Sequence, residues 1–178
     1  SRLDSDNGAI CRRLRHSWRS AIWSAAMRFN QLTWGVKASF RSYVEAVGGS
    51  IKLSDGASRT EDGAFVFAAL PDGDLSIAPD GTATGAMRFQ GTVIFDAHGG
   101  MLKATLTELC LEVGADGFVL TALEAPTNQN RCTIAKLGSV EVGPDDAMTL
   151  AAEITLDGMY QIADNYPPGT ALDPLRLD

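Results

Sequence analysis

A change in the spacing of apolar residues after residue 49 limits what this chain can fold into. From residue 50 onward, apolar residues alternate with polar ones in seven short runs, at residues 50–57, 64–70, 85–97, 101–113, 117–123, 132–142 and 148–158. A period of two is typical of a strand with one buried face. Asp-Gly and Gly-Gly pairs, which suit tight turns, separate several of these runs. The pattern predicts a mainly β domain, an antiparallel sandwich or barrel-like sheet of seven or more strands.

One short helix is predicted before the strands, at about residues 34–47. Thr33 is a candidate cap at its start, and Gly48-Gly49 supplies a stop. One face of this helix carries residues at spacings of three and four, namely Val36, Ser39, Phe40, Tyr43 and Val47. Tyr43 is therefore expected on the apolar side, and spacing alone favours a packing role for it.

The run from Met87 to His98 predicts where a histidine lies. Its larger apolar residues, such as Phe89 and Phe95, share one face of a strand, and His98 falls on the opposite face. Gly99-Gly100 follows at once and suits a tight turn. His98 is thus expected at a strand end, as a rim residue that reaches into a groove.

The first 31 residues differ from the rest of the chain. They carry six arginines against two aspartates, and residues 9–29 have the spacing of a basic amphipathic helix. This predicts two units: a basic N-terminal helical extension or leader at 1–31 and a β domain at 32–178. The alternative role for the extension is contact with a membrane surface or a partner.

Charge and cysteine content exclude several classes of function. The chain has a formal net charge of −7 although its first segment is basic, so the body is acidic, which argues against a nucleic-acid partner. No apolar run reaches the roughly 18–20 residues that a membrane-spanning helix needs. The three cysteines form no metal-binding motif. A Cys110–Cys132 disulfide is conceivable if their strands are neighbours, although free buried cysteine is the commoner state.

The search for catalytic motifs leaves one pair of residues. The chain has no G-x-S-x-G elbow, no phosphate-binding glycine loop and no EF-hand spacing. Tyr43 and His98, the only histidine after residue 31, remain. A phenol has a reference pKa of about 10, but ferric iron stabilises a phenolate, and tyrosine is one of the few protein ligands of haem iron.

Several stretches in order along the chain resemble one family. "LTWGVKASFRSYV" (32–44), "GGSIKLSDGASR" (48–59), "FQGTVIFDAHGGMLKATLTEL" (89–109) and "ITLDGMYQIADNYPPGTALDPLRL" (154–177) are similar to the HtaA domain, a bacterial haem-binding module of cell-surface haem-uptake systems. "AFVFAAL" (64–70) resembles an early strand of the same domain. The resemblance covers about residues 32–177 and leaves out residues 1–31.

The resemblance implies a β-sandwich with a short helix and a ferric haem b cofactor. It implies Tyr43 as the iron ligand and His98 as its hydrogen-bond partner. Ser39 and Phe40 would line the pocket, with Ser39 near a propionate, and Tyr166 would close it. The implied role is haem capture or transfer, not catalysis, with other haem-uptake proteins or receptors as partners.

The implied location is extracellular, at the cell surface or in the periplasm. The rival interpretations are a module for another ligand and an adhesive sandwich without one. A haem peroxidase is a weaker rival, because His98 is already assigned beside the tyrosine and no second acid–base residue is evident.

Overall fold

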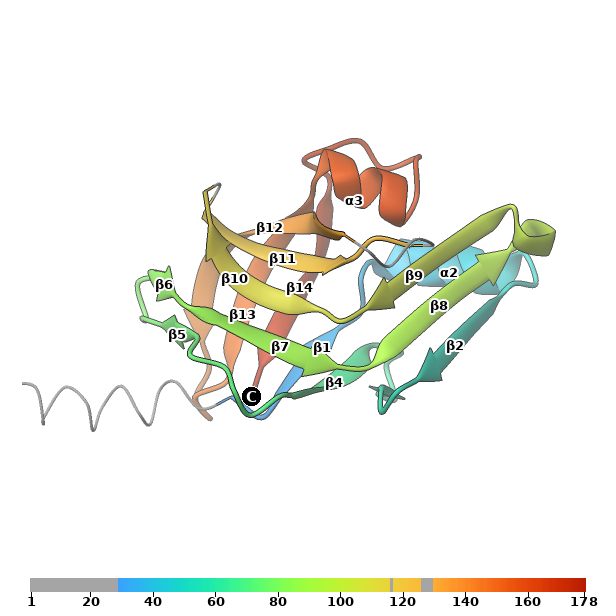
Figure 1. Cartoon of the computed structure of the whole chain (residues 1–178). Coiled ribbons are helices and arrows are strands. Elements are labelled where there is room, and N and C mark those ends of the chain that lie inside the picture. Colours follow the sequence, from blue (N-terminus) through green and yellow to red (C-terminus); the bar gives the residue numbers. More distant parts are fainter. Residues whose placement is uncertain (1–28, 116, 126–129) are drawn as a thin grey trace, which may run out of the picture.

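The chain folds mainly into antiparallel strands in this computed structural model, which describes residues 29–115, 117–125 and 130–178 (Figure 1). The basic helix expected at residues 9–29 lies outside the described residues except for Phe29. The strands are β1 (Gln31–Trp34), β2 (Ser50–Ser54), β3 (Ser58–Arg59), β4 (Phe65–Ala69), β5 (Ser76–Ile77), β6 (Ala83–Thr84), β7 (Ala86–Gln90), β8 (Thr92–Ala97), β9 (Leu102–Thr107), β10 (Cys110–Gly114), β11 (Gly117–Leu123), β12 (Arg131–Val142), β13 (Met148–Ile154) and β14 (Ala171–Leu177). The helices are α2 (Ala38–Ala46), α3 (Leu156–Gln161) and the 3-10 turn η1 (His98–Gly100).

Eight of the strands close into a barrel-like sheet. They pair in the order β1-β14-β13-β12-β11-β10-β7-β4, and β4 pairs back onto β1. The two-residue strand β3 pairs with the first two residues of β4, whereas β7 pairs with the last two. Closure leaves these eight strands without a long open edge, which removes a site for unwanted strand pairing. The prediction of a mainly β antiparallel domain of seven or more strands is confirmed.

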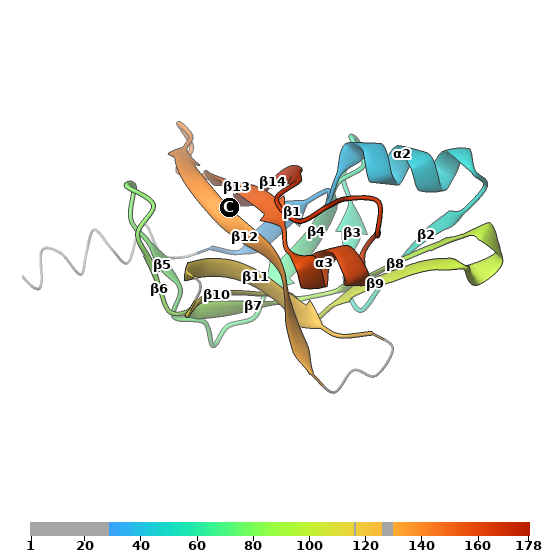
Figure 2. The same ribbon diagram turned by 90° about the horizontal axis from the view of Figure 1, so that it is seen from above.

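A second, three-stranded sheet forms a lobe that projects from the barrel. It has the order β2-β8-β9, and α2 lies along it, as the right-hand half of Figure 1 and the view from above in Figure 2 show. Strands β7 and β8 follow each other in the sequence but belong to different sheets. The expected single strand at 85–97 is therefore wrong: Gly91, with a φ of +134°, divides it.

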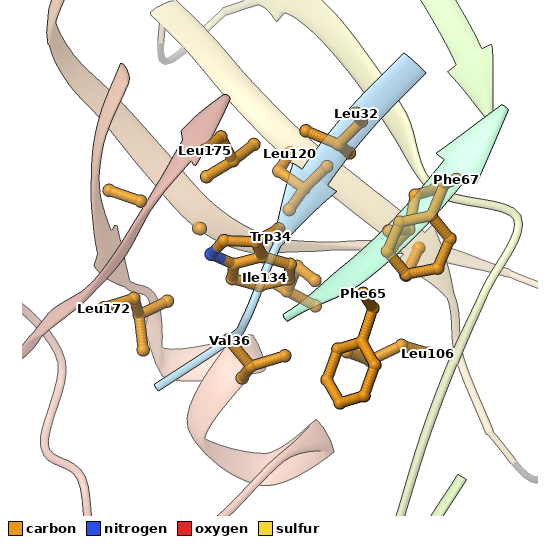
Figure 3. Packing of buried hydrophobic residues seen from close by; sticks show 14 of the residues in the cluster. Leu32, Trp34, Val36, Phe65, Phe67, Leu106, Leu120, Ile134, Leu172 and Leu175 are labelled. Carbon is orange, nitrogen blue, oxygen red and sulfur yellow. The ribbon is translucent and has the colours of Figure 1, made fainter. Parts of the chain in front are cut away.

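The core fills the barrel and continues under α2. Trp34 and Phe65 are almost completely buried beside Leu32 and Phe67 (Figure 3). The ring of Phe65 lies 5.7 Å from that of Phe95 on β8. Phe95 in turn lies 4.9 Å from Phe40 on α2. This aromatic series joins the barrel, the lobe and the helix, so the helix that carries Tyr43 is packed against the same core as the strands.

The start of the predicted helix is wrong. Residues 31–34 form β1, in which Thr33 pairs with Val66 on one side and Arg176 on the other. Thr33 is therefore a strand residue instead of a helix cap. The segment looked helical because Val36 falls at helical spacing from Phe40, but Val36 has a φ of +64° and lies before the helix, which begins at Ala38.

A short helix replaces the end of the last predicted strand. The run at 148–158 forms a strand only to Ile154, and Thr155 then caps α3, because its hydroxyl oxygen accepts a hydrogen bond from the backbone N–H of Gly158 at 2.9 Å. The last strand, β14, lies near the C-terminal end of the sequence and pairs with both β13 and β1.

The conceivable disulfide does not form. Cys110 and Cys132 are free thiols on β10 and β12, and β11 lies between those strands. Two spacings between adjacent strands amount to about 10 Å, beyond the separation of about 7 Å that a disulfide tolerates between Cα atoms. The longest helix in the described part of the chain, α2, has 9 residues and is too short to cross a membrane.

Candidate functional site

Tyr43 projects from the outer side of α2. The inner side of the helix is set by Phe40 and Val44, whose side chains are buried at 1% and 0% exposure. Tyr43 precedes Val44 and is 46% exposed. The residues expected on one helical face therefore differ in burial. Phe40 packs into the core, while Tyr43 and Val47 are exposed to solvent. The phenol is thus anchored by its helix, and its side chain reaches the solvent.

His98 begins the turn at the tip of the lobe. It follows β8 at once and has a φ of +55°, and the next residues, Gly99 and Gly100, also have positive φ values of 65° and 93°. Three successive left-handed residues make a tight turn that only glycine-rich sequence forms readily. The imidazole is exposed, as the rim position predicted.

The lobe brings Tyr43 and His98 together. The phenol oxygen of Tyr43 lies 2.6 Å from Nε2 of His98, in a hydrogen bond whose donor depends on the protonation states of the two groups. The two ring centroids are 5.7 Å apart. Since the residues are 55 positions apart in the sequence, the contact exists only because α2 lies along β8. A phenolate oxygen there would accept from Nε2–H and keep further lone pairs for a ligand.

Ser39 and Tyr166 form a second polar group on the same face of α2. Ser39 lies one helical turn before Tyr43, and its hydroxyl is 3.2 Å from the hydroxyl of Tyr166. The ammonium of Lys37 lies 5.6 Å from the centre of the Tyr166 ring and donates to the carbonyl of Ala171 at 2.9 Å. Two hydroxyls beside a cation form a corner suited to a carboxylate.

Phe40 lies below this face instead of on it. Its ring is 6.3 Å from that of Tyr166, in an edge-on arrangement, and its other neighbour is Phe95. It therefore supports Tyr166 and the helix from the core. Four of the five residues expected at the site, Tyr43, His98, Ser39 and Tyr166, present polar atoms at the surface.

Sequence reasoning assigned no role in the site to Met101, Val47 or Lys37. Met101 follows the His98 turn and is 90% exposed, and Val47, the residue that caps the end of α2, is 40% exposed. Lys37 comes to this position only in the folded chain, because the carbonyl to which it donates, that of Ala171, is 134 positions away in the sequence. A lone exposed methionine or lysine has no spacing that would mark it in the sequence.

Tyr43 and His98 are both exposed to solvent. Two cavities of about 360 and 380 Å³ lie elsewhere, one at the junction of barrel and lobe beside Asp55 and Gln90, the other over β12 and β13 beside Lys136. Neither is lined by any of the five expected site residues. Among residues 29–115, 117–125 and 130–178, no group of three or more His, Cys, Asp or Glu side chains is arranged to hold a bare metal ion.

Comparison with solved structures gives the same fold for related domains. The C-terminal domain of HtaA from Corynebacterium glutamicum is similar at 25% identity and a TM-score of 0.64, over 85% of this chain and 96% of that one. The N-terminal domain of the same protein is similar at 23% identity and a TM-score of 0.63, over 85% and 97%. The heme binding protein HtaB from the same organism is similar at 17% identity and a TM-score of 0.59, over 84% and 91%.

A search of curated proteins found no match. The sequence model of one protein family, described as Htaa, matches residues 30–178. That span holds the fourteen strands and the two α-helices of the described residues, together with the paired Tyr43 and His98. The chain therefore belongs to the HtaA family.

Proposed function

We propose that this chain is a haem-binding module in which Tyr43 ligates ferric haem iron and His98 holds the phenolate by a hydrogen bond. The observation that carries the proposal is the 2.6 Å contact between the exposed phenol and the exposed imidazole. Family membership and the similar heme binding protein HtaB support haem as the ligand class. Ferric iron is a hard acid and favours an anionic oxygen ligand.

The residues on this face fit the shape and charge of haem. A haem has a flat apolar ring and two carboxylates. The apolar ring would contact Val47 and Met101 beside the Tyr43–His98 pair, both of them exposed to solvent. A carboxylate would reach the corner formed by Ser39, Tyr166 and Lys37. That corner starts one helical turn from Tyr43, at Ser39, which the family resemblance places near a propionate.

The proposed role of His98 is to tune the Tyr43 phenolate as a ligand. Its Nε2–H would donate to the phenolate oxygen, stabilise the negative charge and fix the direction in which the remaining lone pairs point. A hydrogen bond of this kind adjusts a ligand without replacing it. We therefore propose a binding and transfer module instead of an enzyme, because the imidazole of His98 is already committed to the phenol.

The cellular role follows from the chemistry and remains part of the proposal. A tyrosinate ligand favours ferric over ferrous iron, so affinity should fall on reduction. An open face suits capture and release better than permanent burial. We propose that the module works in haem uptake outside the cytoplasm, at the cell surface or in the periplasm, and exchanges haem with other uptake proteins or receptors.

A titration with ferric haem tests the ligand assignment. The wild type should give the high-spin visible spectrum of a tyrosinate complex. Tyr43→Phe keeps the ring and removes the oxygen, so this spectrum should disappear. His98→Ala should still bind, but roughly 10- to 100-fold more weakly, as is typical when the partner of a ligand is removed.

Tyr160→Phe is the matched control. Tyr160 on α3 is 73% exposed, so this change also removes an exposed phenol from the surface. It should leave both spectrum and affinity unchanged. If Tyr43→Phe bound haem with the wild-type spectrum and affinity, Tyr43 would not be the ligand.

A further inference from the structure

The helix that carries Tyr43 has no cap of its own. The first backbone N–H groups of a helix lack partners within it and need acceptors from elsewhere. Lys37 occupies the cap position of α2 without a side-chain hydrogen bond to it, and the first turn holds no acidic residue. The N–H of Ala38 instead donates to Oδ1 of Asp173 at 3.2 Å. The capping carboxylate thus comes from β14, 135 positions later in the chain.

The second oxygen of Asp173 holds the same helix at another point. Nη1 of Arg41 donates to Oδ2 of Asp173 at 2.9 Å and to the carbonyl of Gly35 at 2.7 Å. The Arg41 side chain is 13% exposed and that of Asp173 32% exposed, so the ion pair is largely shielded. One carboxylate therefore binds both the first residue of α2 and a side chain one turn further along.

Asp173 is itself held firmly by the segment before the helix. Its backbone N–H donates to the carbonyl of Val36 at 2.8 Å. Its carbonyl accepts from Nε1 of the buried Trp34 at 2.8 Å. The carboxylate consequently has a fixed position relative to the barrel core, and it transmits that position to α2.

Gly35 leaves room for this arrangement. A Cβ atom at Gly35 would overlap Nη1 of Arg41 and would lie 2.9 Å from Oδ2 of Asp173. Both separations are well below van der Waals contact, so the guanidinium lies directly against the glycine backbone. Any larger residue at this position would displace the ion pair.

We propose that Asp173 and Arg41 are positioning residues, which set the rotation of α2 so that Tyr43 faces His98 at hydrogen-bond distance. The inference rests on the proposed function of Tyr43. Neither residue touches the phenol. Phe40 and Val44 fix the inner face of the helix on the lobe, and the Asp173–Arg41 pair fixes its start on the barrel. Without the pair, the helix keeps its core contacts but can turn about them, which moves Tyr43 away from His98.

The haem-free protein gives the first test. The chain has two histidines, His16 and His98, so imidazole nitrogen NMR signals in a His16→Gln background belong to His98. Tyr43→Phe defines the signals of an unpaired His98. Asp173→Asn and Arg41→Lys should shift the signals toward that reference, while far-UV circular dichroism stays close to the wild type. The double variant should be no worse than either single one, because both remove the same contact.

The ferric haem complex gives the second test. Asp173→Asn and Arg41→Lys should lose haem to an excess of apomyoglobin about tenfold faster than the wild type, the lower end of the range for residues that orient a ligand. Asp145→Asn is the matched control, since it removes the exposed Arg176–Asp145 ion pair and should change neither measurement.

Unchanged His98 signals in both Asp173→Asn and Arg41→Lys would overturn the positioning role. This outcome is separable from failure of the proposed function. If the wild type does not bind ferric haem through Tyr43, the haem spectrum shows it, whereas the imidazole signals of the haem-free protein still report on the helix position.

Discussion

At the scale of single residues, the site depends on side chains that the fold leaves exposed beside ones that it buries. Tyr43 and Val44 are neighbours in the sequence, yet one is 46% exposed and the other fully buried. Val44 and Phe40 supply the packing energy of α2; truncation of a buried Phe typically costs about 3–5 kcal/mol. Tyr43 therefore contributes chemistry, while its neighbours contribute the stability that holds it in place.

The thiols of Cys110 and Cys132 are expected to react slowly. Burial raises the pKa of both, and the nearby carboxylate of Glu112 adds to the effect at Cys110. A raised pKa means that less of the reactive thiolate is present at a given pH. In a Cys11→Ser background, alkylation by iodoacetamide at pH 8 should be much slower than in urea-unfolded protein, and it should accelerate as the pH rises further.

The unfolded protein is the internal control for this prediction, because its thiols have the ordinary cysteine pKa. Mass spectrometry of the alkylated peptides would distinguish the two cysteines. Equal rates for folded and unfolded protein at pH 8 would show that the thiols are accessible and unshifted. A spontaneous Cys110–Cys132 disulfide would contradict the strand order, since β11 lies between them.

At the scale of elements, Gly91 allows β7 and β8 to run into different sheets. Its φ of +134° is in a region that other residues rarely adopt, and a Cβ there would lie 2.9 Å from Phe67 and from Ala57. Gly91→Ala should therefore lower the free energy of unfolding by about 1–3 kcal/mol. Urea unfolding followed by circular dichroism measures the change.

Gly114→Ala provides the comparison at the end of β10. Gly114 has no positive φ, and a Cβ there would meet no atom within 4 Å. This variant should be as stable as the wild type or slightly more stable. If Gly91→Ala and Gly114→Ala were equally stable, the turn at Gly91 would not need glycine, and the division between barrel and lobe would have another cause.

The same elements show how far the sequence predicts the structure. Alternation of apolar residues identified most long strands, because each has one buried face. It missed β1, since Thr33 looked like a helix cap and Val36 fits a helical spacing with Phe40. It also predicted β7 and β8 as one strand, because the alternation of apolar and polar residues continues through Gly91 although the two strands belong to different sheets.

The candidate site was predictable to a similar degree. Family resemblance placed Tyr43 and His98 at the site, and the fold brings their polar atoms to 2.6 Å from each other. No sequence pattern linked Asp173 to α2, because a capping group 135 positions away becomes local only after β14 has paired with β1.

At the scale of the whole molecule, closure of the barrel defines where the folded unit begins. Strand β1 pairs with both β4 and β14, so the first and last strands complete one sheet. Just before β1, Phe29 is 7% exposed within the core, and the N–H of Asn30 donates to the carbonyl of Asp178 at 2.6 Å. We therefore propose that the domain starts at Phe29, three residues before the boundary expected from the sequence.

Removal of residues 1–28 tests this boundary. The shortened chain keeps β1 and Phe29, so we expect its free energy of unfolding to stay within about 0.5 kcal/mol of that of the full chain. Phe29→Ala in the shortened chain should cost about 3–5 kcal/mol, because it removes a buried ring. Ferric haem should bind both unmutated chains equally, since every proposed contact lies beyond residue 36. A large loss of stability on removal of residues 1–28 would mean that the N-terminal segment belongs to the folded domain, and a neutral Phe29→Ala would move the boundary back to β1.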